Sequence, residues 1–304
     1  METLCPRHRV CLKALPEQTI DKRRVDMLFV YISVPLAVIL GVWIFLIAPG
    51  KRRDMDSFKS VRYAHRGLHG EKNGVLAAEN SMTAFRRAVD AGFGIELDVH
   101  ASADGVPVVF HDGTLKRVTG AEGRVEDKTA AELAALSLLG TDEGIPTLAE
   151  VLKLVGGRVP LLVEIKANGA SKRAAELAAE VLAGYTGPYI VESFNPLSLG
   201  VFKEKLPEVR RGFLLDKFTA QKKYRTFIHA ITQRCLLNFI ARPDFISANK
   251  NRIGLFPLPL IRFLFRIPCV AWTVTSEEEE QNAYKSGFDG VIFENYTPDG
   301  GTKK

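Results

Sequence analysis

Nine short apolar runs rich in β-branched residues follow one another along most of the chain, and helical patterns separate nearly all of them. The connection between the second and third runs is the exception. It reads HASADG, which is too short for a crossover helix and ends in the turn signal Asp104-Gly105. The third run should therefore return antiparallel as a hairpin, which leaves eight parallel strands. The predicted strands are Val61–His65, Gly94–Val99, Val106–His111, Pro160–Lys166, Tyr189–Phe194, Arg211–Leu215, Asp244–Ala248, Pro268–Thr275 and Gly290–Glu294.

Eight parallel strands that alternate with helices predict an α/β protein, and the closed TIM (β/α)8 barrel is the favoured fold class. Continuous apolar runs such as PLLVEI and CVAWTV are typical of strands covered on both faces. A doubly wound open sheet is the rival, but no Gly-x-Gly-x-x-Gly turn follows the first strand and polar residues end several different strands. The predicted helices are Ser81–Ala91, Ala130–Leu136, Thr147–Leu154, Ser171–Ala183, Pro196–Lys205, a stretch around Thr219–Ala241, and Glu277–Lys285.

An uncharged run of 22 residues, Met27–Ala48, precedes these strands. As a helix it would measure about 33 Å, enough to cross the hydrocarbon core of a bilayer. A cleaved signal peptide is the alternative, but the run is longer than a usual signal core and no small-x-small site follows before Lys51. The sequence predicts an uncleaved, single-pass transmembrane helix. Basic residues flank both of its ends, so the positive-inside rule does not assign a side of the membrane to the predicted barrel.

The predicted organisation is a basic tail over residues 1–26, the transmembrane helix over 27–48, a linker over 49–60, the barrel domain over 61–298 and a tail over 299–304. The formal net charge is +6, and much of it lies in two clusters, Lys22-Arg23-Arg24 and Lys51-Arg52-Arg53. Basic clusters beside an apolar segment favour a membrane surface over a nucleic-acid partner. The four cysteines fit no zinc-binding spacing and are predicted to be unpaired.

Carboxylates stand where two of the predicted strands end. Glu96 and Asp98 are two residues apart, so both side chains lie on one face of their strand, towards the barrel axis. In a barrel of this kind the carboxyl ends of the strands meet at one mouth, which brings Glu164 close to them. Carboxylates so close repel unless a cation lies between them. Three oxygen donors predict a divalent cation, Mg²⁺ or Ca²⁺, rather than zinc.

Two histidines end strands at the same mouth. His65 and His111 are the candidate acid–base pair, because the imidazole pKa lies near neutrality and one ring can accept a proton while the other donates one. Arg66 and Lys166 are predicted to bind the phosphate of a substrate. No Gly-x-Ser-x-Gly elbow or P-loop is present, which argues against serine hydrolases and nucleotide kinases. Weaker candidates for the pocket are Glu79, Asn80, Glu192 and Trp272, while His69 and His100 are expected to face solvent. Asn80 or Ser81 also stands at the cap position of the following helix, so capping explains Asn80 without a function.

The order of these motifs resembles the glycerophosphodiester phosphodiesterase family, over about Val61 to Pro298. The resemblance implies a TIM barrel that hydrolyses glycerophosphodiesters to glycerol 3-phosphate and an alcohol with a divalent cation. It places the catalytic histidines on His65 and His111 and the metal carboxylates on Glu96, Asp98 and Glu164. The motifs are His65-Arg66-Gly67, Glu79-Asn80-Ser81, Glu96-x-Asp98-Val99, Asp104-Gly105, Val108-Val109-x-His111-Asp112, Ile145-Pro146-Thr147-Leu148, Glu164-x-Lys166, Ser193-Phe194 and Ala271-Trp272-Thr273-Val274.

Two features depart from the family pattern. The last strand ends in Phe293-Glu294-Asn295-Tyr296 rather than in an Asp- or Asn-rich loop, and Lys217–Ile267 matches no motif. The apolar segment Ile253–Ile267 and the predicted anchor also suit a lysophospholipase D that acts on lysophospholipids in the membrane. A catalytically inactive, membrane-tethered module that binds phosphodiesters is the alternative of another class.

Overall fold

The computed structural model describes residues 22–50, 54–217 and 227–299, and the chain divides into two compact units, Met1–Ile44 and Phe45–Lys304. Helix α1 spans Lys22–Ile47 with Pro35 inside it. Among the described helices it is the one long and apolar enough to cross a membrane, with a mean hydropathy of 2.5 over Phe29–Ile47. A signal sequence has the same character. Most of the predicted basic tail, residues 51–53 of the predicted linker and most of the C-terminal tail lie outside the described residues.

Eight parallel strands close into a barrel, as predicted. Strand β1 pairs with both β11 and β4, so the sheet has no free edge among these eight and the open-sheet alternative is wrong. Strand β5 is antiparallel to β4, with Val99 opposite Val109, which confirms the predicted hairpin. In order around the barrel the strands are β1 (Arg62–Ala64), β4 (Gly94–Ala101), β6 (Leu161–Ile165), β7 (Tyr189–Ser193), β8 (Arg211–Leu215), β9 (Phe245–Asn249), β10 (Cys269–Val274) and β11 (Gly290–Phe293), with β5 (Pro107–Val109) beside β4.

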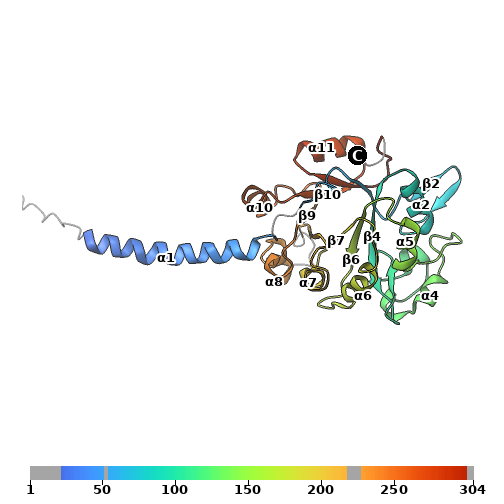
Figure 1. Ribbon diagram of the computed structural model, residues 1–304, viewed down its shortest axis with the longest axis horizontal. Coiled ribbons are helices and arrows are strands. Elements are labelled where there is room, and N and C mark those ends of the chain that lie inside the picture. Colours follow the sequence, from blue (N-terminus) through green and yellow to red (C-terminus); the bar gives the residue numbers. More distant parts are fainter. Residues whose placement is uncertain (1–21, 51–53, 218–226, 300–304) are drawn as a thin grey trace, which may run out of the picture. The chain divides into compact units, whose positions relative to one another are not determined.

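Helices surround the barrel (Figure 1), and several of them begin at a residue whose side chain caps the first turn. The Thr147 side chain accepts a hydrogen bond from the Glu150 amide and the Glu150 side chain caps in return, which fixes the start of α5. Ser81 and Ser276 cap two further helices. The helices are α2 (Met82–Asp90), α3 (Lys116–Thr119), α4 (Ala130–Ala134), α5 (Leu148–Val155), α6 (Arg173–Leu182), α7 (Pro196–Lys205), α8 (Phe227–Gln233), α9 (Asn238–Ala241), α10 (Leu258–Phe265) and α11 (Glu277–Lys285).

Strands β2 (Gly70–Lys72) and β3 (Val75–Ala77) and helices α3 and α10 were not predicted. The two strands form a hairpin whose turn residues, Asn73 and Gly74, both have positive φ. Asn-Gly is the usual signal for such a turn. Helix α10 forms despite its proline because that residue lies in the first turn, where a missing amide N–H is tolerated. Of the predicted helix around Thr219–Ala241, residues 219–226 lie outside the described residues, and the rest forms α8 and α9.

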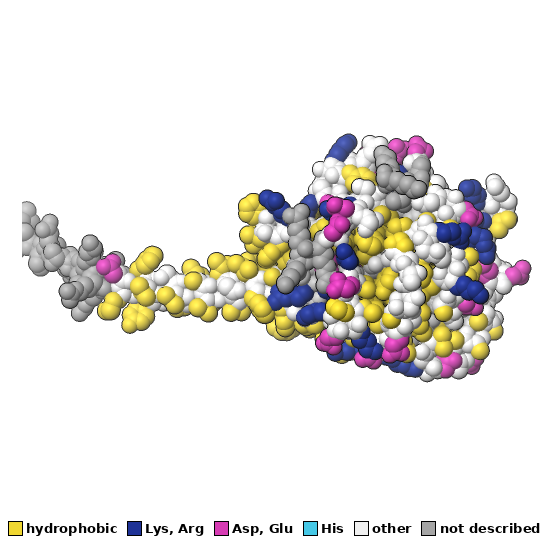
Figure 2. Space-filling model, viewed as in Figure 1, with side chains coloured by type: hydrophobic (Ala, Val, Ile, Leu, Met, Phe, Trp, Pro, Cys, Tyr) yellow, Lys and Arg dark blue, Asp and Glu magenta, His cyan; other side chains and the backbone are white. Residues whose placement is uncertain are grey.

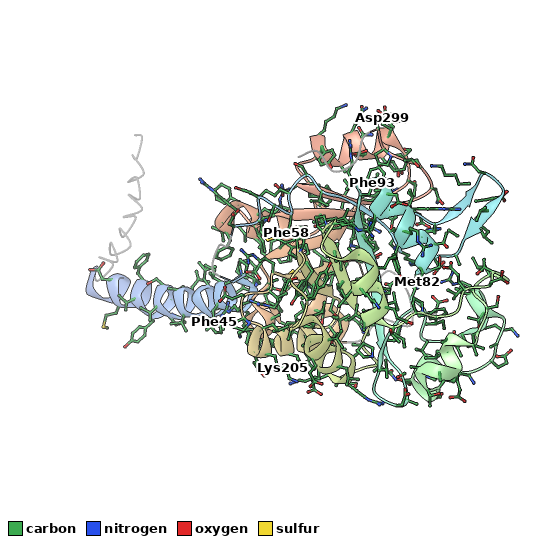
Figure 3. The ribbon with its side chains drawn as sticks, turned by 45° about the vertical axis from the view of Figure 1, so that its right-hand side comes forward. Phe45, Phe58, Met82, Phe93, Lys205 and Asp299 are labelled. Carbon is green, nitrogen blue, oxygen red and sulfur yellow. The ribbon has the colours of Figure 1, made fainter. Side chains whose placement is uncertain are left out.

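Large apolar side chains fill the barrel below its mouth (Figure 3). Tyr63, Leu162 and Phe245 are fully buried there, and Met55 and Phe58 pack against this cluster from the segment that leads into β1. The base of the barrel, which is the face opposite the mouth, is therefore closed. The polar residues at the carboxyl ends of the strands are therefore supported by a closely packed apolar core.

Gly212 in β8 leaves the space that the Phe245 ring occupies, since a Cβ atom at this position would lie 2.2 Å from that ring. Gly212→Ala is therefore expected to destabilise the barrel by about 1–3 kcal/mol, the usual cost of overpacking a core. Thermal unfolding of the detergent-solubilised protein, followed by near-UV circular dichroism, measures the change in Tm. Gly254→Ala is the matched control, because a Cβ there meets nothing within 4 Å. An unchanged Tm for Gly212→Ala would contradict the packing described above.

Candidate active site

Three buried carboxylates gather at the mouth. Glu96 and Asp98 project from β4 and Glu164 from β6, and the register of these neighbouring strands sets Asp98 opposite Glu164. All three side chains are buried, and one oxygen from each lies within 4.8 Å of the others. The structure therefore brings these three carboxylates together at the mouth.

The pKa values of the three carboxyl groups are shifted in different directions. Burial, together with the charges of Asp98 and Glu164, raises the pKa of Glu96 well above its ordinary value. Burial raises the pKa of Glu164 to about 7 against the opposing charge of Lys166. Burial would also raise the pKa of Asp98, but the Lys166 ammonium and the charges of His111 and Arg66 hold it well below the ordinary range. Such a site favours an added positive charge.

Lys166 stands at the centre of this arrangement. Its Nζ lies 2.8 Å from Asp98 Oδ1 and 2.7 Å from Glu164 Oε1. The ammonium thus supplies a positive charge between two of the carboxylates. Buried oxygen donors at this spacing, already gathered around a cation, fit a hard divalent ion.

His65 follows β1, and a carboxylate that the sequence analysis did not assign to the site orients it. His65 Nδ1 lies 3.0 Å from Glu294 Oε2, and His65 Nε2 lies 4.0 Å from Glu96 Oε2. Glu294 follows β11 and also lies 3.3 Å from His69 Nε2. Burial lowers the pKa of His65, although the hydrogen bond to Glu294 opposes this shift. The position of Glu294 after a barrel strand was the available signal.

Arg66 occupies a turn that requires glycine at the next position. Arg66 itself has φ 55° and Gly67 has φ 80°, and a Cβ on Gly67 would lie 2.9 Å from Ala84. The turn aims the Arg66 amide at Glu96 Oε2, 2.9 Å away. The guanidinium lies 3.5 Å from Asp98 Oδ2 through Nε. The His-Arg-Gly motif thus places an imidazole and a guanidinium beside the carboxylates.

His111 follows β5 and is fixed by a chain of charged groups. Its Nδ1 lies 2.7 Å from Asp112 Oδ1, and Arg117 Nε donates to Asp112 Oδ2 at 2.6 Å. Arg117 also donates twice to Glu79, which in turn accepts from Arg66 Nη1 at 2.9 Å. Burial lowers the pKa of His111, while the charge of Asp98 opposes the shift. The chain connects the ends of β1 and β5.

Two expectations about neighbouring residues need correction. Asn80 is not the helix cap; Ser81 is, and Asn80 is buried and donates from Nδ2 to Asp98 Oδ2 at 2.8 Å. His69 and His100 do not face solvent: both are partly buried, His69 beside Glu294 and His100 with Nε2 3.1 Å from the His111 carbonyl. These residues support the side chains around them.

The remaining candidates lie on neighbouring strands. Glu192 in β7 is buried in register with Glu164, and burial together with the charge of Glu164 raises its pKa to about 8. Trp272 in β10 contacts Phe194 edge to face, with ring centroids 5.8 Å apart.

A closed parallel barrel with an acidic, histidine-containing mouth belongs to the class of barrel hydrolases that act at the carboxyl ends of their strands. Residues 65–297 match the model of the glycerophosphoryl diester phosphodiesterase family, and the chain belongs to this family.

Several known proteins are similar to this chain, two of the following three over most of its length. A glycerophosphodiester phosphodiesterase of Caldanaerobacter subterraneus is 32% identical over 248 residues, which cover 77% of this chain and 93% of that protein. The structure of an Oleispira antarctica phosphodiesterase in complex with the product sn-glycerol-3-phosphate is 26% identical, with a TM-score of 0.64, and the match covers 78% of this chain and 94% of that one. The rat lysophospholipase D GDPD1 is 36% identical over 130 residues, 38% of this chain and 40% of that protein. The chain is a glycerophosphodiester phosphodiesterase.

Proposed function

We propose that this enzyme hydrolyses glycerophosphodiesters to glycerol 3-phosphate and an alcohol by an acid–base pair, His65 and His111, around one divalent cation. The observation that carries the proposal is the trio of buried carboxylates, whose oxygens lie within 4.8 Å of one another beside the His65 ring. Glu96, Asp98 and Glu164 would hold the ion, Mg²⁺ or Ca²⁺. When bound, the cation neutralises phosphate charge and acts as a Lewis acid.

The two imidazoles divide the proton transfers between them. Glu294 beside Nδ1 of His65 and Asp112 beside Nδ1 of His111 favour the tautomer that leaves Nε2 of each ring for the reaction. One ring removes a proton from the attacking oxygen and the other protonates the departing alkoxide. The attacking oxygen is that of water or of a neighbouring glycerol hydroxyl. Glu294 and Asp112 are positioning residues in this scheme.

Arg66 and Lys166 are proposed to bind the phosphate. Arginine has five N–H donors and lysine has three, so their contacts with Glu79, Asp98 and Glu164 leave donors for phosphate oxygens. Both cations face charge that develops at phosphorus in the transition state. Their ion pairs with the carboxylates also keep them in place before substrate arrives.

The anchor is part of the proposal. From residue 29 onward the side chains of α1 are mostly apolar and exposed, with Phe29 at 71% and Tyr31 at 72%, which is costly in water and favourable in lipid. We propose a single-pass membrane protein in which residues 27–48 span the bilayer, residues 49–60 link the span to the domain over 61–298, and the two tails flank them.

A second candidate function is lysophospholipase D activity on lysophospholipids in the membrane. It is favoured by the exposed apolar side chains of α10, where Phe263 is 81% exposed. The rat lysophospholipase D that matches part of this chain points the same way.

A substrate panel with the reconstituted full-length enzyme tests the function. We expect release of glycerol 3-phosphate from glycerophosphocholine in the presence of Mg²⁺ or Ca²⁺. Faster release of lysophosphatidic acid from lysophosphatidylcholine in the same vesicles would favour the second candidate. Binding of both substrates without turnover under every metal condition would leave the inactive binding module as the remaining alternative.

A further inference from the structure

Helix α10 exposes an apolar stripe. Pro259, Phe263 and Leu264 are exposed on one side of the helix, at spacings of four and one residues, and we call them the α10 stripe. Leu258 and Ile261 on the opposite face are fully buried. A helix that is apolar on its outer face as well as its inner one requires a partner that is not water.

The stripe lies near the point where the apolar helix α1 joins the barrel unit. Ile47, the last residue of α1, is fully buried, and its carbonyl accepts a hydrogen bond from Asn238 Nδ2 at 2.9 Å. Arg242 Nη1 donates to the carbonyls of Phe45 and Ala48, each at 3.0 Å. The end of α1 is thus fixed to α9.

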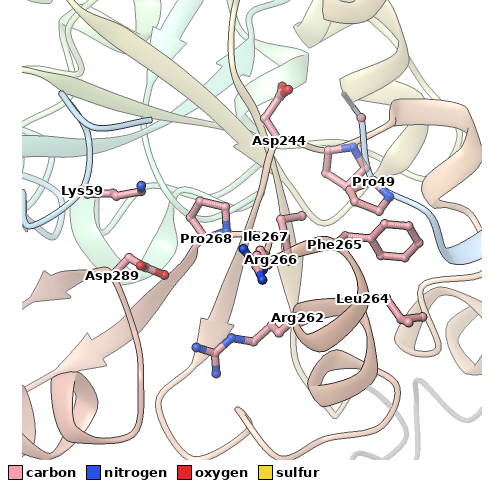
Figure 4. A pocket seen from close by; sticks show the side chains of 12 residues that line it. Pro49, Lys59, Asp244, Arg262, Leu264, Phe265, Arg266, Ile267, Pro268 and Asp289 are labelled. Carbon is pink, nitrogen blue, oxygen red and sulfur yellow. The ribbon is translucent and has the colours of Figure 1, made fainter. Parts of the chain in front are cut away.

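The next two residues of the chain reach α10. Pro49 and Gly50 line a cavity of about 600 Å³ together with Leu264, Phe265 and Arg266 of α10 and its C-cap (Figure 4). A membrane that holds α1 therefore meets the barrel unit beside α10. This proximity rests on contacts within the unit Phe45–Lys304.

Positive charge borders the stripe. Arg262 and Arg266 lie one helical turn apart beside the stripe, and Lys59 faces the same cavity. Arg262 Nη2 donates to the Gly287 carbonyl, and Lys59 Nζ lies 2.8 Å from Asp56 Oδ1. The two carboxylates of the cavity have partners within the barrel unit: Asp244 Oδ2 accepts from the Arg211 amide at 2.9 Å, and Asp289 Oδ2 from the Cys269 amide at 2.8 Å. Figure 2 shows Lys and Arg side chains beside apolar ones at this edge of the barrel. In the sequence, Lys51-Arg52-Arg53 follows Gly50 directly.

We propose that the α10 stripe inserts into the headgroup region of the same bilayer that holds α1, with Arg262 and Arg266 against anionic lipid phosphates. An apolar helical face bordered by arginines is the pattern of interfacial helices that bind anionic membranes. A second copy of the chain fits less well, because the basic border would face itself across a twofold axis. The proposal rests on the membrane anchor proposed above and goes beyond it, since it assigns a second contact with lipid.

The stripe also relates the membrane to the catalytic mouth. Pro259 lies in the first turn of α10, which follows the carboxyl end of β9 on the mouth side, whereas Phe263 and Leu264 lie in the last turns of α10, towards the base. Docking along the stripe brings the rim of the mouth at β9 to the lipid surface. Amphiphilic phosphodiesters in that leaflet then reach the site without leaving the membrane.

Site-directed spin labelling of the full-length protein in nanodiscs with anionic lipid tests the proposal. In a Cys5→Ser, Cys11→Ser background the remaining cysteines, Cys235 and Cys269, are buried. Single labels are placed by Phe263→Cys on the stripe, Val38→Cys in α1 and Val75→Cys on the exposed β2–β3 hairpin, which is the matched control. Relaxation by oxygen reports lipid, and relaxation by a water-soluble nickel chelate reports solvent.

The expected result is that the label at 263 responds more to oxygen than to nickel, with a smaller oxygen response than the label at 38, while the label at 75 responds to nickel. A lipid response at 38 with a solvent response at 263 would overturn the α10 proposal and leave the anchor intact. A solvent response at 38 would instead show that the anchor fails. Broadening at 263 that grows with the number of copies per disc would identify a second copy as the occupant and overturn the lipid assignment. Arg266→Gln is expected to reduce the oxygen response at 263, as is replacement of the anionic lipid by a zwitterionic one.

Discussion

His65→Ala is expected to lower kcat for glycerophosphocholine by about 10²–10⁴-fold, the usual contribution of one proton transfer. The physical reason is its place between Glu294, which lies beside Nδ1, and the carboxylate centre, which Nε2 approaches at 4.0 Å from Glu96. His111→Ala is expected to lower kcat over the same range. Steady-state release of glycerol 3-phosphate measures both effects.

His69→Gln is the matched control for His65→Ala. His69 shares Glu294 with His65 but approaches it from the opposite carboxylate oxygen. Its replacement should change kcat far less, and the Tm of all three variants should stay close to that of the wild type. Near-normal turnover by His65→Ala would remove this residue from the acid–base pair.

Glu96→Gln is expected to reduce activity by at least about 100-fold and to weaken binding of the divalent ion, because outer-sphere changes alone often cost 10–100-fold in metal affinity. The amide oxygen of glutamine can still accept the Arg66 amide, so the turn after β1 should survive. Calorimetric titration with Mg²⁺ and Ca²⁺ measures the affinity, and assays with and without EDTA measure the dependence on metal. Wild-type turnover that persists in excess EDTA would contradict the metal assignment.

Glu192→Gln is the control for Glu96→Gln, because it removes a buried carboxyl group that is not a proposed metal ligand. Glu192 lies in the same barrel interior and its pKa is also raised, but it lies outside the trio of carboxylates. Metal affinity should therefore change little in this variant. Glu96→Gln is also expected not to lower Tm in the absence of metal, because it removes one of the mutually repelling buried carboxyl groups.

The barrel could be predicted because its strongest constraints are local. The short connection after β4 excluded a helix, and this single decision reduced nine strands to eight parallel ones and a hairpin. The same reasoning placed Glu96, Asp98 and Glu164 together, because the alternation of side chains along a strand and the common direction of parallel strands fix where their carboxylates project.

The supports of the two histidines could not be predicted in the same way. Glu294 and Asp112 lie in loops, and Arg117 lies in the four-residue helix α3, which was not predicted. Neither helical nor strand periodicity encodes the conformations of such segments. Asn80 shows a related limit: its place next to Ser81 made capping a sufficient explanation, and only the positive φ of 56° turns its side chain towards Asp98.

The ammonium of Lys166, held between Asp98 and Glu164, bears on how the protein folds in the absence of a metal ion. Because Lys166 already places a positive charge among the carboxylates, the mouth can fold in a compartment that holds little of the divalent ion. Binding of the proposed ion would then be a replacement at a folded site, and a chelator is expected to inactivate the enzyme reversibly rather than unfold it.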